Sequence, residues 1–334
     1  VGPARSLTIV RLDNGQVVMN FRGAANDGPT LPTTKFKSGV FDSPITGIPV
    51  PYPSQTGQVS DRIYVGDADG AVWRIDMRDP KPINWTVDLV WDSYALTSDT
   101  VAVRQPIETP IIPSVDALGN PVLLFSTGDQ ETFTKSNNVR TRVWSVSETR
   151  TNGALVTKSN WVIPLENGVR VTGPISLFNG AAYFSTFTPT GTQLNSCAEG
   201  YGSIWGVDYY KKTNCGTNAA TAPMANYPCA RYVQDPVNSP NVLSFFEDQA
   251  PGAAVFGVSV AQTPNCYEEV TYTDPYLGSV TSVGNSNAGE FQLFYQTGRP
   301  NSSSTDGSST ISYTKPLPPP RTSVRVDSWG LVLE

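Results

Sequence analysis

Apolar residues occur in this chain as short runs, and one arrangement of runs is found three times. In segments 63–76, 122–146 and 182–208, an apolar run ends in small or acidic residues, a turn or loop follows, and a second apolar run contains a tryptophan. The tryptophans are Trp73, Trp144 and Trp205. Short apolar runs bounded by Gly, Asp, Asn or Ser are typical of β-strands. Their recurrence at a similar spacing indicates a repeated β unit.

Flanking segments extend each repeat into a larger group of predicted strands. The first group comprises 41–53, 63–67, 71–76 and 84–91. The second comprises 107–116, 121–129, 142–148 and 160–165, and the third comprises 170–180, 181–189 and 203–210. The first member of each group contains proline, which suits a strand at the edge of a sheet.

The ends of the chain continue the same pattern. Segment 6–21 predicts a hairpin, because Asp13-Asn14-Gly15 tolerates the positive φ angles of a tight turn. After the third group, we expect strands at 255–262 and 290–298, a Ser/Thr/Asn-rich loop at 299–314, and a final strand at 323–334. No run of about 11 residues or more has the apolar spacing of an amphipathic helix. The pattern therefore predicts an all-β protein.

The repeat also predicts an architecture. The spacing between the tryptophans exceeds the roughly 40–50 residues of a minimal four-stranded propeller blade, and loop insertions would account for the excess. We predict one domain over residues 1–334, a β-propeller of six or seven blades, some of them incomplete. The ring would close where the C-terminal strand pairs with the N-terminal hairpin. Because the chain enters a strand pattern by Leu7, we interpret it as one domain of a larger protein.

Composition excludes several kinds of chemistry. The 334 residues contain no histidine, so Ser-His-Asp and Cys-His catalysis and His-based zinc sites are excluded. Charged residues make up 16% of the chain, the net charge is −6, and no cluster of basic residues marks a nucleic-acid surface. No apolar stretch approaches the ~20 residues of a membrane-spanning helix. We expect no nucleic-acid partner and no membrane span.

The four cysteines lie in one loop-rich region of the second half of the chain. They are Cys197, Cys215, Cys229 and Cys266, and none forms a CxxC pair, which disfavours zinc. An even number in a β protein of exported character predicts two disulfides with three possible pairings. We favour Cys215–Cys229 together with Cys197–Cys266, and four reduced thiols remain the alternative.

The repeats also carry a family resemblance. Segment 61–77, DRIYVGDADGAVWRIDM, is followed at 105–129 by QPIETPIIPSVDALGNPVLLFSTGD, and RTSVRVDSW stands at 321–329. This combination resembles the C-terminal propeller domain of the PilY/PilC proteins of type IV pili, over essentially the whole chain. Segment 171–189, VTGPISLFNGAAYFSTFTP, is most similar to the version in Myxococcus-type bacteria.

The resemblance implies a function. A protein of this family is a non-enzymatic pilus-tip factor that docks on minor pilins, supports pilus assembly and counters retraction. It would act in cell adhesion and twitching motility, and it would contact host or abiotic surfaces. The implied localisation is export to the periplasm and then the cell surface at the pilus tip.

One departure from the family concerns calcium. Many members carry a calcium loop before the IYVGD-type strand, and Asp61 matches its last ligand. The preceding alternate positions hold Val59, Gly57, Gln55 and Pro53. Calcium takes six to eight oxygen ligands, and these residues supply no side-chain carboxylate. We expect no metal here and no other cofactor, and calcium bound as in the family, with most of its ligands missing, is the alternative.

The departure from the repeat that we assign to binding is the disulfide-bearing insertion 194–250. Its aromatic residues are Tyr201, Tyr209, Tyr210, Tyr227, Tyr232, Phe245 and Phe246. Aromatic loops pinned on a rigid scaffold suit partner recognition. The alternative is that they cover one face of the propeller.

Other features have simpler explanations. Asp67 and Asp69 could form a small cation site, but acidic residues beside a glycine are typical of turns. The three repeated tryptophans could stack on carbohydrate, but we expect them to pack between blades. The acidic pairs Glu247-Asp248 and Glu268-Glu269 are interpreted as surface charges rather than as glycosidase carboxylates.

Two other functional classes remain as alternatives. Quinoprotein dehydrogenases have propeller repeats with a similar GxxDGxhW sequence, but their adjacent cysteine pair is missing here. A lectin-like or peptide-binding propeller unrelated to pili is the second alternative.

Overall fold

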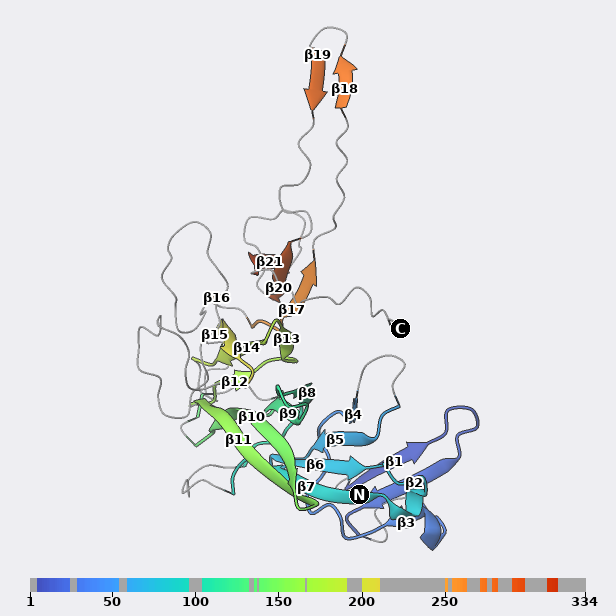
Figure 1. Cartoon of the computed structure of the whole chain (residues 1–334). Coiled ribbons are helices and arrows are strands. Elements are labelled where there is room, and N and C mark those ends of the chain that lie inside the picture. Colours follow the sequence, from blue (N-terminus) through green and yellow to red (C-terminus); the bar gives the residue numbers. More distant parts are fainter. Residues whose placement is uncertain are drawn as a thin grey trace, which may run out of the picture.

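The computed structural model describes most of the repeat region and parts of the C-terminal region. The described residues are 5–24, 29–53, 59–95, 104–131, 135–136, 138–165, 167–190, 200–210, 250–251, 254–262, 271–274, 278–281, 290–297 and 311–317. Over these residues the chain is all-β, as predicted, and forms several small, mainly antiparallel sheets (Figure 1). Two short 3-10 turns, Thr33–Lys35 and Pro82–Asn84, are the helical elements of this described part.

The first two sheets follow the predicted groups. The β1–β3 sheet contains β1 (Ser6–Val10), β2 (Val17–Arg22) and β3 (Phe36–Lys37). The β4–β7 sheet contains β4 (Val50–Tyr52), β5 (Arg62–Gly66), β6 (Ala71–Asp76) and β7 (Thr86–Asp92). The predicted N-terminal hairpin is confirmed, with Gly15 at a φ of 69°. Strand β4 is shorter than predicted, and Ile45 makes only an isolated bridge to Asp67.

The next sheets continue in chain order. The β8–β11 sheet contains β8 (Ile112–Val115), β9 (Pro121–Ser126), β10 (Thr141–Thr151) and β11 (Ala154–Leu165). The β12–β16 sheet contains β12 (Arg170–Val171), β13 (Ser176–Phe178), β14 (Ala181–Thr188), β15 (Tyr201–Asp208) and β16 (Ala250–Pro251). Each predicted strand of the second and third groups coincides with one or two of these.

The last described strands include one correction. The β17–β20–β21 sheet contains β17 (Ser259–Gln262), β20 (Phe291–Thr297) and β21 (Ile311–Pro316), and a separate hairpin pairs β18 (Thr271–Asp274) with β19 (Gly278–Thr281). The loop predicted for 299–314 is wrong from residue 311 onward, because β21 pairs with β20 there, Tyr313 opposite Tyr295. The strand predicted at 323–334 lies outside the described residues.

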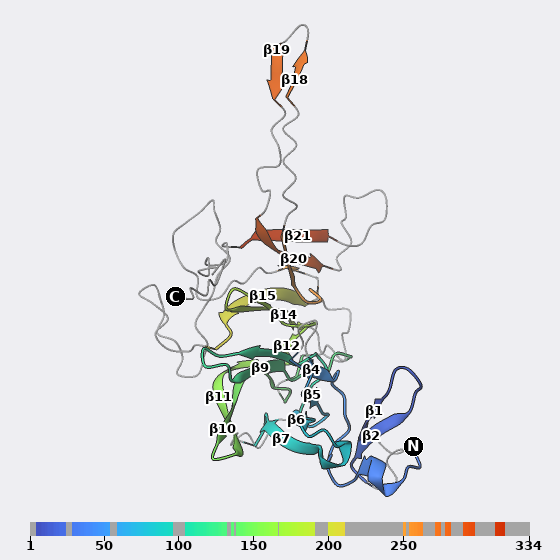
Figure 2. The same cartoon turned by 45° about the vertical axis from the view of Figure 1, so that its right-hand side comes forward.

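The five larger sheets are stacked face to face in chain order (Figures 1 and 2). Each neighbouring pair shares one hydrophobic cluster, and alternate residues of a strand enter different clusters. On β9, Leu123 and Phe125 contact the β4–β7 side, whereas Leu124 contacts the β12–β16 side. Strands buried on both faces have near-continuous apolar sequences for this reason. The core is therefore a series of apolar layers between sheets.

Each repeated tryptophan has the equivalent position in its own sheet. Trp73 lies in the cluster shared with the β1–β3 sheet, Trp144 in the cluster shared with the β4–β7 sheet, and Trp205 packs against the cluster shared with the β8–β11 sheet. Each therefore faces the sheet that precedes its own. Trp73 and Trp144 are buried, which confirms the packing prediction, whereas Trp205 is half-buried and stacks on Phe184 with centroids 5.9 Å apart.

Close backbone approaches join successive sheets. A Cβ added to Gly66 would lie 2.4 Å from Ile107 Cβ. Glycine is therefore required where the end of β5 meets the segment that leads into the β8–β11 sheet. The Thr46 hydroxyl donates to the Ile107 carbonyl at 3.0 Å, and the Ser185 hydroxyl donates to the Val255 carbonyl at 2.9 Å. These bonds tie the chain between consecutive sheets.

Within the described residues, we find no helix that could span a membrane.

Candidate functional site: a charged groove between two sheets

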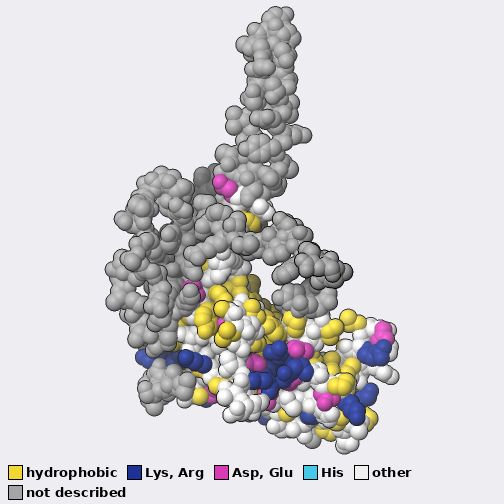
Figure 3. Space-filling view, in the orientation of Figure 1, with side chains coloured by type: hydrophobic (Ala, Val, Ile, Leu, Met, Phe, Trp, Pro, Cys, Tyr) yellow, Lys and Arg dark blue, Asp and Glu magenta, His cyan; other side chains and the backbone are white. Residues whose placement is uncertain are grey.

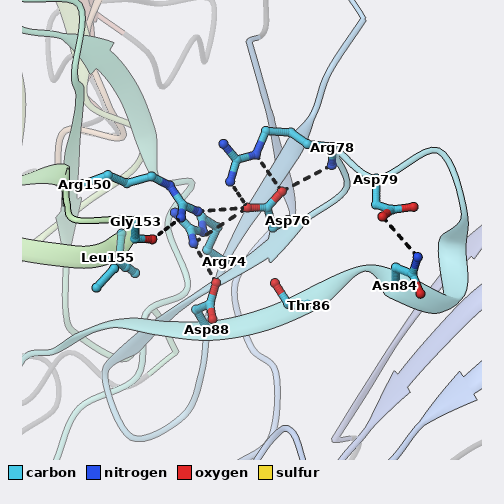
Figure 4. Close-up of a pocket in the computed structure, with 11 residues that line it drawn as sticks. Arg74, Asp76, Arg78, Asp79, Asn84, Thr86, Asp88, Arg150, Gly153 and Leu155 are labelled. Carbon is cyan, nitrogen blue, oxygen red and sulfur yellow. Dashed lines mark hydrogen bonds and ion pairs between the residues drawn. The ribbon is translucent and has the colours of Figure 1, made fainter.

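The β10–β11 hairpin extends beyond its own sheet and reaches the β4–β7 sheet. Strand β9 pairs with β10 only from Val143 to Ser147, whereas β10 and β11 stay paired to Thr151 and Ala154. Asn152 and Gly153 close the hairpin with φ angles of 51° and 82°, as a two-residue turn requires. The projecting end forms one wall of a groove whose other wall is β6 and β7 (Figure 4).

The groove has a volume of about 610 Å³ and is lined mainly by charged side chains. Its lining residues are Arg74, Asp76, Arg78, Asp79, Asn84, Thr86, Asp88, Arg150, Gly153, Ala154 and Leu155. In the space-filling view, basic side chains gather over β5 and β6 with acidic side chains beside them (Figure 3). Three arginines and three aspartates line the groove, so its charges are balanced overall.

A buried ion pair forms the floor of the groove. The Arg74 side chain is 1% exposed and the Glu148 side chain is 3% exposed, and they form a direct salt bridge. Arg74 also donates to Asp88 at 2.6 Å, and the Tyr64 hydroxyl donates to Glu148 at 2.8 Å. Burial raises the pKa of Tyr64 above its usual range, and the Glu148 carboxylate raises it further. Glu148 thus fastens the projecting hairpin to the β4–β7 sheet.

Above this floor, three arginines surround one carboxylate. Asp76 accepts two side-chain hydrogen bonds from Arg78 and one from Arg150 at 3.1 Å, and Arg74 Nη2 lies 3.9 Å from its Oδ2. Figure 4 shows these side chains converging on Asp76. The hydrogen bonds from Arg78 lower the pKa of Asp76 to about 2. The carboxylate therefore stays ionised and keeps the guanidinium groups close to one another.

The remaining acids of the groove are engaged elsewhere. Asp79 accepts from the backbone N–H of Lys81 at 2.8 Å and from Asn84 at 3.1 Å, and it points away from the arginines (Figure 4). Asp88 accepts from Arg74. Arg78 and Arg150 are 45% and 38% exposed in the groove, and Asp88 is equally accessible at 38%.

The chemistry available in this groove is recognition of charge and hydrogen-bonding groups. Guanidinium groups present several N–H donors in a plane, a geometry that matches carboxylates and other oxoanions. Over the described ranges, clusters of three or more Cys, Asp or Glu arranged to hold a metal ion are not found. The arrangement is suited to binding through arginine side chains.

A second hollow lies between loop segments of the β4–β7, β8–β11 and β12–β16 sheets. It has a volume of about 410 Å³, and its polar lining includes Gln105, Glu108, Asp129 and Arg170. Glu108 accepts from the backbone N–H of Gln130 at 2.7 Å, and Arg170 donates to the Asp129 carbonyl. Burial lowers the pKa of Arg170, and the nearby carboxylates act against that change. These bonds hold together the segments that line the hollow.

Among the predicted aromatic binding residues, three are described. Tyr201 begins β15 and is half-buried. Tyr209 joins two sheets, because its hydroxyl donates to the Val115 carbonyl at 2.7 Å and its carbonyl accepts from the Ser145 hydroxyl at 2.7 Å. Tyr210 is 37% exposed, with its ring 6.2 Å from that of Tyr209. Tyr210 is thus the more accessible of this adjacent pair.

The other predicted residues of this region lie outside the described part of the chain. They are Tyr227, Tyr232, Phe245 and Phe246, the four cysteines Cys197, Cys215, Cys229 and Cys266, and the acidic pairs Glu247-Asp248 and Glu268-Glu269. Their roles, and the disulfide pairing, stay predictions.

The aspartates of the first repeat have structural partners. Asp67 accepts from the backbone N–H groups of Asp69 and Ala71 at 3.0 and 2.8 Å and from the Trp73 indole at 2.8 Å. The turn interpretation is therefore confirmed for Asp67. Burial raises its pKa, although these donors oppose the increase. Asp61, the residue that matches the family's last calcium ligand, accepts from Arg62 at 2.9 Å.

The sequence contained a signal for the groove that the motif analysis missed. Arg74, Asp76 and Arg78 alternate along one stretch, and residues two apart lie on the same face of a strand. The contribution of Glu148 had no comparable signal, because it depends on how far the β10–β11 hairpin projects.

Comparison with models of known protein families and with curated proteins finds no match for this chain.

Proposed function

We propose that this chain is a non-enzymatic binding module of the type IV pilus tip, which docks on minor pilins, supports pilus assembly and counters retraction. The observation that carries the proposal is the repeated packing unit, in which each of the three tryptophans faces the preceding sheet. This unit is the one for which the sequence resembles the propeller of the PilY/PilC proteins. Export to the periplasm and then to the cell surface belongs to the same proposal.

The fold proposed with this function is a propeller of six or seven blades. Sheets that are stacked in chain order and buried against their neighbours are what consecutive blades of a ring require. The five stacked sheets would be successive blades. Segment 323–334 would pair with the N-terminal hairpin, whose strand β1 is at the edge of its sheet.

Such a scaffold supports binding because apolar layers and hydrogen bonds join its consecutive sheets. Loops carried on a stable scaffold are common sites of recognition. The charged groove lies at one such junction, and the predicted insertion 194–250 overlaps the end of the third repeat. Minor pilins are the proposed partners, and a host or abiotic surface is the proposed contact of the assembled tip.

A pull-down of the tagged chain with purified minor pilins tests the proposal. We expect the pilins to be retained at physiological salt and the chain to show no dye-linked dehydrogenase activity with added quinone and calcium. A matched bait, another exported β protein with the same tag, should retain none. Loss of pilin retention, or quinone-dependent turnover by the chain, would contradict the proposed function.

A further inference from the structure

We propose that the turn Asn152-Gly153 is a covalent modification site, at which the asparagine converts spontaneously to aspartate and isoaspartate. The turn closes the projecting end of the β10–β11 hairpin, with φ angles of 51° and 82°. All residues of the segment 151–154 are exposed. The inference does not depend on the proposed function, because it concerns the chemistry of this turn alone.

The reaction needs only the turn itself and water. The main-chain nitrogen of Gly153 loses its proton to a base in solution and attacks Cγ of the Asn152 side chain. The new N–Cγ bond closes an imide ring, and the side-chain nitrogen of Asn152 takes up a proton and leaves as ammonia. Water then adds to either ring carbonyl and opens the ring, which gives aspartate from one side and isoaspartate from the other.

The sequence contains four Asn-Gly pairs, and the structure separates them by whether the glycine N–H is already bonded. They are Asn14-Gly15, Asn152-Gly153, Asn167-Gly168 and Asn179-Gly180. The Gly15 N–H donates to the Arg11 carbonyl at 2.9 Å, and the Gly168 N–H donates to the Val139 carbonyl at 3.2 Å. Each of these two nitrogens must give up a hydrogen bond before it can attack.

At the end of the β10–β11 hairpin, both reacting groups are free. Among the described residues, the Gly153 N–H and the Asn152 side chain have no hydrogen-bond partner. A Cβ added to Gly153 would meet nothing within 4 Å beyond its chain neighbours, so the surroundings of the turn are open. The Asn14 side chain, in contrast, accepts a hydrogen bond from the Gln16 N–H at 2.9 Å.

The same turn has few contacts that would prevent it from opening. Local opening lets the side-chain carbon reach the next nitrogen, and it costs least where contacts are few. The hairpin end projects past β9, and Arg150 Nη1 holds the Gly153 carbonyl at 2.9 Å from within the hairpin itself. The Asn179-Gly180 turn is held from another part of the chain, because the Tyr209 N–H donates to the Gly180 carbonyl at 3.3 Å.

Conversion would change one wall of the charged groove. Gly153 lines the groove, and its carbonyl accepts from Arg150. Isoaspartate directs the main chain through the side-chain carbon and lengthens the turn by one atom, so the pairing of Thr151 with Ala154 cannot stay as it is. Either product also adds a carboxylate two residues from Arg150, which already pairs with Asp76. The modification would therefore be a slow, one-way change at this wall.

Peptide mapping by mass spectrometry during incubation of the folded chain at mildly alkaline pH tests the proposal. We expect Asn152 to convert about fivefold faster than Asn14 and Asn167, whose glycines must each give up a hydrogen bond. Asn179 should convert at an intermediate rate. An isoaspartyl methyltransferase should label the peptide that contains residue 152. Asn152→Gln, whose longer side chain disfavours ring closure, should not be labelled at this position.

The reduced and alkylated chain in guanidinium chloride is the control that separates structure from sequence. There the four asparagines should convert at similar rates, because each precedes a glycine and the folded-state hydrogen bonds are gone. Equal rates in the folded chain would overturn the inference. The same order of rates in the folded and unfolded chains, or protection of Asn152 by folding to the same degree as Asn14, would also overturn it.

Discussion

Asp76 shows how one residue organises the charged groove. Its cross-strand neighbour on β5 is Arg62, and Arg74, two positions earlier on β6, shares its face of the sheet. Arg78, two positions later, follows the end of β6. The acid therefore stands among guanidinium groups, and it keeps Arg78 and Arg150 from separating.

The protonation of Asp76 gives a pH-dependent prediction. Its pKa is lowered from 3.8 to about 2 by the hydrogen bonds from Arg78. A carboxylate with a lowered pKa in the folded state stabilises the fold above its unfolded-state pKa and loses that contribution as pH falls through the folded-state pKa. We expect Asp76→Asn to be less stable than the natural chain at about pH 6, with most of that difference lost between about pH 4 and pH 2.

Urea denaturation of both proteins at a series of pH values measures this difference. Comparing the two proteins at each pH removes the effect of the other carboxylates that both contain. A stability difference that is the same at about pH 2 as at about pH 6 would contradict the assigned ion pairs.

Single residues also mark the limits of sequence interpretation. The hydrogen bonds of Asp67 in its turn were predictable, because an acid before a glycine is a local feature. The role of Tyr209 was not, because its hydroxyl bonds to Val115, which is distant in sequence. Local chemistry is visible in a sequence, whereas contacts between sheets are decided by packing.

At the scale of elements, the β10–β11 hairpin connects two sheets. Its end projects past β9, and Glu148 and Arg150 contact the β4–β7 sheet from it. The prediction located the strands near 142–148 and 160–165 but missed their length. Polar residues such as Thr149, Thr151 and Thr157 do not continue an apolar pattern, although they are paired with neighbours in the hairpin.

Glu148→Gln tests this connection. The substitution keeps the shape of the side chain but removes the charge that pairs with buried Arg74, and breaking a buried ion pair costs about 3 kcal/mol or more. We expect a lower free energy of unfolding in urea and faster hydrogen exchange in residues 148–157. Asp13→Asn, which breaks an exposed pair, is the control and should change neither measurement detectably.

Unchanged exchange at the hairpin end in Glu148→Gln would show that the ion pair does not hold the hairpin. A loss of stability equal to that of the Asp13→Asn control would have the same meaning.

At the scale of the whole molecule, the stack of sheets is the dominant feature. The order of the sheets follows the order of the repeats, and this much was predictable because each repeat carries its own tryptophan and turn residues. The number of blades and the closure of a ring belong to the proposal. They depend on pairing between segments far apart in sequence, which the repeat pattern does not determine.

The tryptophans allow the stack to be tested as a unit. Trp144 is buried between two sheets, so Trp144→Ala should lower the free energy of unfolding by about 3–5 kcal/mol. Trp205 is half-buried, so Trp205→Ala should cost less. Chemical denaturation of both variants provides the comparison. A larger loss for Trp205→Ala would contradict the assigned packing order.

The most direct test of the proposed fold and function is an experimental structure of this chain in complex with a minor pilin. We expect the stacked sheets to close into a ring of six or seven blades and the pilin interface to bury at least about 1,000 Å². An open stack, or an interface well below that area, would contradict it.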